Sequence, residues 1–384
     1  MLGIASAPLA AAPAAGGATF QTTAPFAVLV DAASGAVLFD KHADDLVAPA
    51  STAKIMTAEI VFDRLAAGRL KLDDTLPISE HAWRTGGAPS GGSTMFAALN
   101  SRIRVEDLVR GLVVVSGNDA AIALAEGIAG TEEAFAALMN ERAATLGMTR
   151  SHFSNPWGRG DPAQKVTARE MAMLARHLIA TYPTYYRYFG ERDFLWNRIR
   201  QQNRNPLLAL PIGADGLKTG DIADSGFGLV GSAVQGDRRL IVVVNGSRTA
   251  KDRAVEAEKL LRWGFGAFES RALFEAGATV GHARVFGGES MTVPLEAAGA
   301  VAVLQPRDGA EPLTGRIVYE GPLPAPVERG QLVAHLKLMR GSSEVLDVPL
   351  RTAQNVPIGS LARRAVDAGL ELMTGVLRSD VFKR

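Results

Sequence analysis

The sequence has no cysteine in its 384 residues, so disulfide bonds, a thiolate nucleophile and a cysteine-ligated metal are all excluded. Histidine is also scarce, with six scattered residues and neither a His-Glu-x-x-His pattern nor a close pair. We therefore expect no metal site and no cofactor. Acidic and basic residues nearly cancel to a net charge of +1, which gives no electrostatic basis for binding nucleic acid.

Lysine is rare as well: only nine of the 41 basic residues are lysine, and the other 32 are arginine. Position 54 is nevertheless a lysine, three residues after Ser51. Arginine stays protonated in proteins, whereas a buried lysine can lose its proton. A position that acts as a base would keep lysine against this bias, so Lys54 is a candidate general base. The alternative is a lysine that remains there by chance.

Long apolar runs are missing too. No stretch of about 18 apolar residues occurs, so we expect no membrane span. The first 30 residues carry no charge and contain Ala5-Ser-Ala7. We interpret residues 1–24 as the remnant of a secretory signal, which predicts an exported protein. A flexible, alanine-rich extension is the alternative.

Three short motifs occur in a fixed order: Ser51-Thr-Ala-Lys54, Ser116-Gly-Asn118 and Lys218-Thr-Gly220. Their first residues are separated by 65 and then 102 positions. Each motif alone is weak evidence. Together they match the active-site elements of penicillin-binding proteins and serine β-lactamases.

The local pattern predicts where each motif lies. Apolar residues recur at helical spacing from Ser51 to Ala67, so Ser51 lies near a helix start and Lys54 one turn further on the same face. An N-cap is the purely structural role for Ser51. Helices over 105–115 and 120–128 place Ser116-Gly-Asn118 at their junction, where a simple turn would also fit. A Gly/Ser-rich segment at 86–94 reads as a surface loop beside the cleft.

Strands and a further helix complete an α/β core. Lys218-Thr-Gly220 lies on a strand predicted over 214–221. The remaining predicted elements are strands over 26–30, 36–39, 226–234 and 240–245 and a helix over 249–265.

The C-terminal region has a different sequence pattern. After about Gly277, strand-like stretches (292–295, 300–304 and 332–339) alternate with turns. We therefore predict a catalytic domain over 25–270 and a small β-rich domain over 278–356, with the boundary between 268 and 282.

The segment 358–384 reads as an amphipathic C-terminal helix, because Val366, Leu370, Met373 and Leu377 recur at helical spacing. Such a helix could lie on a membrane surface, dock on the β-rich domain or form a dimer.

The chain resembles the low-molecular-mass penicillin-binding proteins that act as D-alanyl-D-alanine carboxypeptidases. The resemblance covers roughly residues 25–270 and adds further segments to the three motifs. These segments are Ala48–Thr57, Ser93–Phe96, Ser116–Ala120, His152–Gly158, Asp215–Gly220 and Leu260–Phe265. The β-rich domain and the amphipathic helix also look like that family, which implies peripheral contact with the outer face of the cytoplasmic membrane in the periplasm.

The resemblance implies a role for each motif residue. Ser51 would attack the carbonyl between two D-alanines of a peptidoglycan stem peptide, with Lys54 as base and Ser116 passing the proton to the leaving amine. Asn118 would bind the substrate amide, and Lys218, Thr219 and Gly220 the terminal carboxylate. The backbone N–H groups of Ser51 and Asp221 would form the oxyanion hole. β-Lactams, which resemble the substrate, would acylate Ser51.

One residue departs from the pattern: Asp221 follows Lys218-Thr-Gly220, where family members often have histidine or another residue. Strand alternation puts Asp221 on the face of Thr219, opposite Lys218 and Gly220. We expect its carboxylate to point away from the substrate. A carboxylate that pointed at the substrate would repel the substrate's own terminal charge.

Three alternatives remain. A class A β-lactamase would need a Glu-x-x-x-Asn element between the second and third motifs, and none occurs between residues 119 and 217. A non-catalytic peptidoglycan-binding scaffold would not be expected to keep Ser51, Lys54, Ser116 and Lys218. Endopeptidase cleavage of cross-links is a closer variation that the sequence leaves open.

Overall fold

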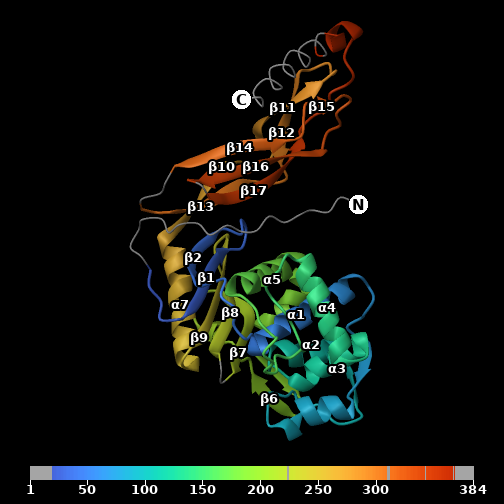
Figure 1. Ribbon diagram of the computed structural model, residues 1–384, viewed down its shortest axis with the longest axis vertical. Coiled ribbons are helices and arrows are strands. Elements are labelled where there is room, and N and C mark those ends of the chain that lie inside the picture. Colours follow the sequence, from blue (N-terminus) through green and yellow to red (C-terminus); the bar gives the residue numbers. More distant parts are fainter. Residues whose placement is uncertain (1–19, 223–224, 309–311, 342, 366, 368–384) are drawn as a thin grey trace. The chain divides into compact units, whose positions relative to one another are not determined.

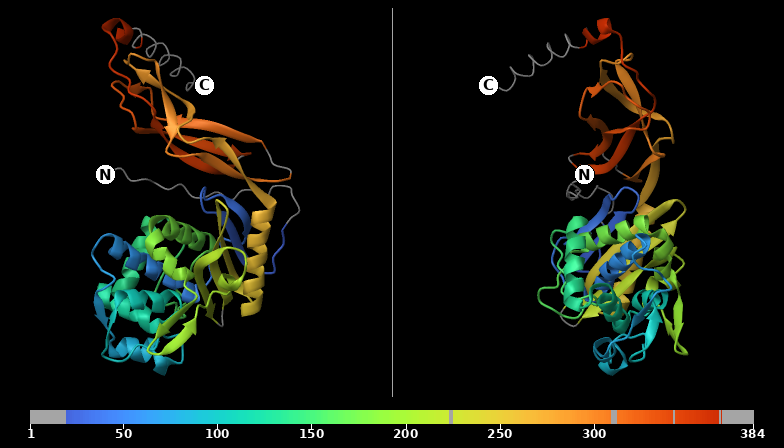
Figure 2. Two further views of the ribbon diagram at one scale, coloured as in Figure 1. Left: turned by 180° about the vertical axis from the view of Figure 1, so that it is seen from behind. Right: turned by 90° about the vertical axis from the view of Figure 1, so that its right-hand side faces the viewer.

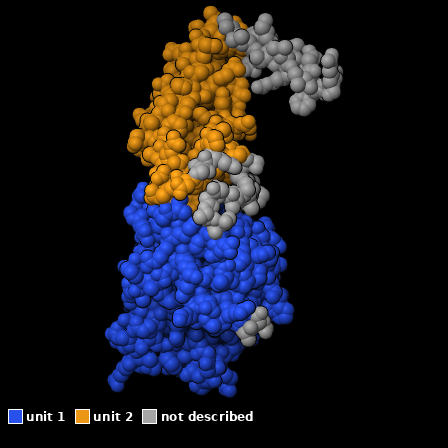
Figure 3. Space-filling model, turned by 90° about the vertical axis from the view of Figure 1, so that its left-hand side faces the viewer, with its two compact units in different colours: residues 1–14, 18–267 blue, residues 15–17, 268–384 orange. Residues whose placement is uncertain are grey.

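The computed structural model describes residues 20–222, 225–308, 312–341, 343–365 and 367. The chain divides into two compact units between Ala267 and Phe268 (Figure 3). This division lies at the start of the interval in which the sequence places the boundary.

The first unit is built on a five-stranded sheet in which all neighbouring strands are antiparallel, in the order β2-β1-β9-β8-β7. The strands are β1 (Phe26–Asp31), β2 (Val37–Lys41), β7 (Ala214–Ile222), β8 (Gly226–Gln235) and β9 (Arg238–Ser247). The β-branched run of β9 is buried in the middle of the sheet, whereas β7 forms one edge. An edge strand keeps unpaired backbone groups that an extended peptide can bind.

Helices cover both faces of this sheet. Both α5 (Ala168–Thr181) and α7 (Ala250–Ala267) pack on β9, with α7 on the face opposite to the other helices (Figures 1 and 2). The helix α1 (Lys54–Ala66) is almost wholly buried at the centre of the unit. The other helices are α2 (Val105–Val113), α3 (Asn118–Ala129), α4 (Glu132–Thr145) and α6 (Pro183–Tyr186).

Short elements connect these helices and strands. The two small hairpins pair β3 (Thr75–Pro77) with β4 (Arg102–Arg104) and β5 (Asp193–Trp196) with β6 (Ile199–Gln202). The short helical turns are η1 (Ala50–Ala53), η2 (Ala82–Gly86), η3 (Ala88–Ser90), η4 (Arg187–Gly190) and η5 (Pro206–Ala209). The helix predicted from Ser51 is real, but its first turn is the 3₁₀ segment η1.

The folded unit starts before residue 25. Glu256 of α7 accepts hydrogen bonds from the Thr22 hydroxyl at 2.7 Å and the Thr23 N–H at 3.0 Å. The ring of Phe20 packs on that of Trp263, with centroids 5.1 Å apart. Residues 20–24, which we assigned to a signal remnant, are therefore part of the packed domain. Residues 1–19 of that expected segment lie outside the described residues.

The second unit is all-β, as predicted. It contains a six-stranded sheet in the order β14-β16-β17-β12-β11-β15 and a separate pair, β10 and β13. Its own core includes Val293, Leu295, Leu336 and Leu350. The strands are β10 (Phe268–Phe274), β11 (Thr279–Phe286), β12 (Thr292–Ala297), β13 (Val301–Pro306), β14 (Leu313–Tyr319), β15 (Leu323–Pro324), β16 (Leu332–Arg340) and β17 (Ser343–Thr352).

A helix begins where the C-terminal helix is expected. Residues 361–365 and 367 are helical, and the Asp367 carboxylate accepts a hydrogen bond from the Gly287 N–H at 2.9 Å. The rest of the predicted helix lies outside the described residues. Within the described part of the chain, no helix has the length and apolar character needed to cross a membrane.

Candidate active site

Ser51 lies in η1, at the point where the chain enters the buried helix α1. The residue before it, Ala50, has a left-handed backbone with φ of 46°. Two glycines from other segments approach closely. A Cβ atom at Gly158 would lie 1.9 Å from the Ala50 carbonyl oxygen, and one at Gly220 would lie 3.0 Å from the Ser51 backbone nitrogen. Only residues without a side chain fit at these two positions, which fixes the backbone around Ser51.

Lys54 is fully buried one turn after Ser51. Its Nζ lies 3.0 Å from Ser51 Oγ, 2.8 Å from Asn118 Oδ1 and 2.6 Å from the Trp157 carbonyl oxygen. A neutral amine has two hydrogens and one lone pair. It can donate to Asn118 and Trp157 while its lone pair accepts the Ser51 hydroxyl proton.

The electrostatic surroundings favour this neutral form. Burial is the largest cause that lowers the pKa of Lys54 well below its usual value, and the charge of Lys218 lowers it further. Asp119 and Asp221 act in the opposite direction. Burial is the cause that the lysine argument of the sequence analysis relies on. The charge of Lys218 adds to it.

The second motif forms a tight turn between α2 and α3. Ser116 is buried, with a left-handed φ of 62°, and Asn118 is the first residue of α3. The Asn118 N–H donates to the Ser93 carbonyl oxygen at 2.8 Å. The Gly/Ser-rich segment over 86–94 therefore ends directly beside the motif.

Asp119 was not assigned a role from the sequence, yet it organises this corner. Its buried carboxylate accepts hydrogen bonds from the Thr94 hydroxyl at 2.6 Å and from the N–H groups of Met95 and Ala97, both at 3.0 Å. It therefore links the Ser93–Phe96 segment to the Ser116 turn. The adjacency of Asp119 to Asn118 was the only sequence signal for this role.

The third motif lies on the edge strand β7, where Lys218, Thr219 and Gly220 are all buried. Burial, with Arg204 and then Arg253 nearby, lowers the pKa of Lys218 to about 7. Arg204 is exposed, whereas Arg253 on α7 is buried and has no hydrogen-bond partner for its Nε. The sequence analysis missed both arginines, because neither belongs to a motif. Their charges lower the pKa of Lys218, and the charge of Asp221 opposes them.

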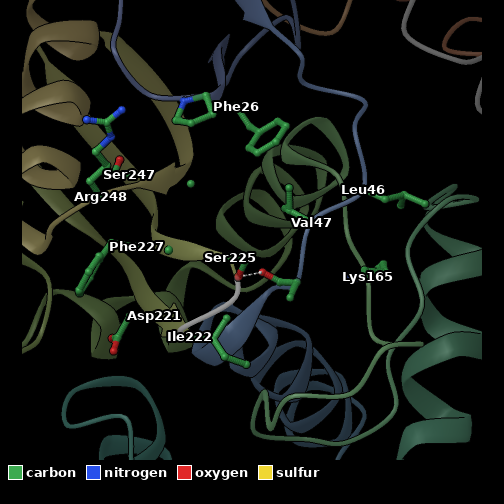
Figure 4. A pocket seen from close by; sticks show the side chains of 14 residues that line it. Phe26, Leu46, Val47, Lys165, Asp221, Ile222, Ser225, Phe227, Ser247 and Arg248 are labelled. Atoms are coloured by element: carbon green, nitrogen blue, oxygen red, sulfur yellow. Dashed lines mark hydrogen bonds between the residues drawn. The ribbon is translucent and has the colours of Figure 1, made fainter.

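Asp221 is exposed at the end of this motif. Its charge raises the pKa of both Lys54 and Lys218, so its field reaches the centre of the site. In the close view, its carboxylate points away from Ser225 and Val47 (Figure 4). That the Asp221 carboxylate does not repel the terminal carboxylate of the substrate stays a prediction.

The fold thus brings together residues from all three motifs. Ser51, Lys54 and Asn118 are joined by hydrogen bonds, Gly220 contacts the Ser51 backbone, and Lys218 acts on Lys54 through its charge. Among the described residues, no group of acidic or histidine side chains is arranged to hold a metal ion. The arrangement is one in which a serine hydroxyl can be activated by a neutral lysine.

Comparison with known families agrees with this geometry. Residues 10–249 match the model of the D-alanyl-D-alanine carboxypeptidase family of peptidases, and residues 268–357 match that of the C-terminal domain of penicillin-binding protein 5. The chain is 40% identical to D-alanyl-D-alanine carboxypeptidase DacC of Escherichia coli, over 88% of this chain and 86% of that protein. It is 30% identical to DacF of Bacillus subtilis, over 86% and 85%.

Solved structures give the same result. Penicillin-binding protein 5 from Haemophilus influenzae superposes with a TM-score of 0.79 at 36% identity, covering 89% of this chain and all of that one. Penicillin-binding protein D2 from Listeria monocytogenes, solved in an ampicillin-bound form, covers 65% of this chain, with a TM-score of 0.58 and 26% identity. The β-lactamase and scaffold alternatives are not favoured by these relatives. The chain belongs to the D-alanyl-D-alanine carboxypeptidase family and is a serine-type peptidase of the penicillin-binding protein fold.

Proposed function

We propose that this chain removes the terminal D-alanine from peptidoglycan stem peptides through an acyl-serine intermediate on Ser51, and that β-lactams acylate the same serine. The observation that carries the proposal is the buried amine of Lys54 at 3.0 Å from Ser51 Oγ. A serine hydroxyl is a weak nucleophile and requires such a base.

In the proposed acylation, Ser51 Oγ attacks the carbonyl carbon between the two D-alanines while Lys54 takes the hydroxyl proton. The N–H groups of Ser51 and Asp221 bind the oxyanion of the tetrahedral intermediate. Ser116 passes the proton to the nitrogen of the leaving D-alanine. Water then hydrolyses the ester and releases the shortened peptide.

A carboxypeptidase has to bind the terminal carboxylate of its substrate. We assign its binding to Lys218, Thr219 and Gly220 of β7, with Asn118 binding the amide of the substrate. The positive surroundings that Arg204 and Arg253 create at Lys218 support this assignment, because a carboxylate placed there would relieve the repulsion among these cations.

Intact-protein mass spectrometry after incubation with penicillin tests the proposal. We expect a penicilloyl adduct on the parent chain and none on Ser51→Ala, whose melting temperature should be unchanged. A long-lived adduct, together with release of D-alanine from a peptide ending in D-Ala-D-Ala, supports the carboxypeptidase. Rapid loss of the adduct with drug turnover would point to a β-lactamase, and an adduct on Ser51→Ala would overturn the assignment of the nucleophile.

We further infer an exported, periplasmic enzyme that contacts the outer face of the cytoplasmic membrane through its C-terminal helix. Exposed apolar side chains surround the described start of that helix, namely Phe286, Met291, Ile358 and Leu361. They lie close together, because the segments 287–289 and 357–359 are joined by backbone hydrogen bonds. An apolar surface beside an amphipathic helix supports contact with lipid.

Flotation with phosphatidylglycerol vesicles tests the membrane contact. Leu361 is 81% exposed, so Leu361→Glu should weaken vesicle binding without loss of folding. Leu195→Glu is the matched control, because Leu195 is an exposed leucine of the first unit. Equal flotation of the parent and both variants would contradict the proposed contact.

A further inference from the structure

A cavity lies next to the candidate active site and has no role in the chemistry described so far. Its volume is about 800 Å³, and Figure 4 shows the side chains that line it. One wall is the segment 46–48, which leads into Ser51. The adjoining wall includes Asp221, Ile222 and Ser225, which follow Lys218-Thr-Gly220, and the Ser225 hydroxyl donates a hydrogen bond to the Ala48 carbonyl oxygen at 3.3 Å. The cavity therefore begins where the elements that carry Ser51 and the third motif meet.

The lining has unsatisfied polar groups. The Ser247 Oγ is buried and has no hydrogen-bond partner. Buried hydroxyl groups normally have a partner, so an unpartnered one that lines a cavity can form a hydrogen bond with a bound ligand. Two cations, Lys165 and Arg248, also line the cavity. Neither of these side chains has a hydrogen-bond or ion-pair partner among the described residues. Apolar wall is supplied by Phe26, Val47 and Phe227.

The direction of the substrate follows from the proposed function, on which this inference rests. If the terminal carboxylate lies at Thr219 and the scissile carbonyl at the Asp221 N–H, the peptide runs antiparallel to the edge strand β7. Residues that precede the two D-alanines then continue past Asp221 toward Ile222, which lines the cavity. An extended peptide bound to an edge strand is a common recognition mode.

We propose that this cavity is a subsite for the part of the stem peptide that precedes D-Ala-D-Ala, and that Lys165 and Arg248 select a carboxylate in that part. The Ser247 hydroxyl supplies a hydrogen bond to the bound peptide. The apolar wall accommodates the aliphatic portion of the same residue.

Two synthetic peptides of equal length test the proposal, both ending in D-Ala-D-Ala and differing only in glutamate or glutamine immediately before it. A third substrate, Nα-acetyl-D-Ala-D-Ala, lacks the preceding residue. For the parent chain, we expect kcat/KM to be roughly 1.5- to fivefold higher for the glutamate peptide, as for one exposed charge contact. The double variant Lys165→Gln/Arg248→Gln should lose this preference and hydrolyse Nα-acetyl-D-Ala-D-Ala at the parental rate. Lys251→Gln, which removes an exposed charge outside the cavity lining, should keep the preference.

Ser247→Ala gives an independent readout. Because the hydroxyl makes no hydrogen bond in the free protein, its removal should not lower the melting temperature. It should lower kcat/KM for both longer peptides and leave Nα-acetyl-D-Ala-D-Ala unaffected. Equal kcat/KM for the glutamate and glutamine peptides in the parent, or an unchanged preference in the double variant, would overturn the subsite. Failure to hydrolyse any of the three substrates would instead overturn the proposed function and this inference with it.

Discussion

Lys54 donates a hydrogen bond to the carbonyl oxygen of Trp157 at 2.6 Å, across 103 positions of the sequence. Together with the Asn118 side chain, this carbonyl takes up the two hydrogens of a neutral amine and leaves the lone pair for Ser51. The orientation of the base is therefore fixed by two residues that lie in different segments from the Ser51-x-x-Lys54 motif.

Lys54→Arg should remove acylation by penicillin, because it puts a permanent positive charge where the neutral lysine acts as the base. An arginine stays protonated and cannot take the serine proton. Loss of a general base typically lowers the rate by roughly 100- to 10,000-fold. The measurement is the second-order rate of adduct formation by mass spectrometry, with the melting temperature as a check on folding. A folded variant that acylates at the parental rate would show that Lys54 is not the base.

Lys218 should destabilise the folded protein in a pH-dependent way. Its pKa falls from 10.5 to about 7 on folding, because the charged form is buried. Below about pH 7 the lysine is charged in both states, and the full cost of burial, on the order of 5 kcal/mol, is present. As the pH rises from about 7 toward 10.5, only the unfolded state stays protonated, so the cost disappears and stability rises.

Lys218→Met should therefore raise the melting temperature of the first unit by several degrees at about pH 6 and by less at about pH 10. Lys251→Met on α7 is the control, because it makes the same substitution at an exposed position. Thermal unfolding followed by circular dichroism at both pH values gives the answer. A gain that stays constant or grows with pH would refute the assigned sign.

The sequence predicted the helices and strands that carry the three motifs, but no element between residues 129 and 213, where α4, α5 and α6 lie. The order of strands and helices around the three motifs followed from apolar periodicity, because each element is long enough to carry a full pattern. The turn at Ser116 was predicted from its position between two helices. The first turn of the helix at Ser51 was not recognised as 3₁₀, since periodicity cannot distinguish it over one turn.

The contacts that complete the site could not be predicted in the same way. Trp157, Arg204 and Arg253 reach Lys54 or Lys218 only through tertiary structure. Trp157 acts through its backbone carbonyl, which every residue type possesses, so its side chain gives no signal. The cavity beside Asp221 likewise depends on the meeting of segments that are far apart in the sequence.

Asp221→Asn should move the acidic limb of acylation to lower pH. The Asp221 charge raises the pKa of Lys54 and Lys218, so its removal lowers both. A larger fraction of Lys54 is then neutral at a given acidic pH. The pH dependence of penicillin acylation measures the shift, with Asp252→Asn on α7 as the control. If the limb stays in place or moves to higher pH, Asp221 does not act on the base as described.

Gly158→Ala should disrupt acylation through the backbone alone. Gly158 has a φ of +88°, and a Cβ atom there would lie 1.9 Å from the Ala50 carbonyl oxygen, so the segment before Ser51 has to move. A displacement of about 1 Å at a catalytic group can lower the rate roughly 100-fold.

Gly68→Ala is the matched control, because Gly68 also has a positive φ, of +67°, but no atom within 4 Å of the added Cβ. Gly68→Ala should cost about 1 kcal/mol of stability through its backbone and keep the parental acylation rate. Parental acylation in both variants would show that the close approach of Gly158 to Ala50 does not position Ser51.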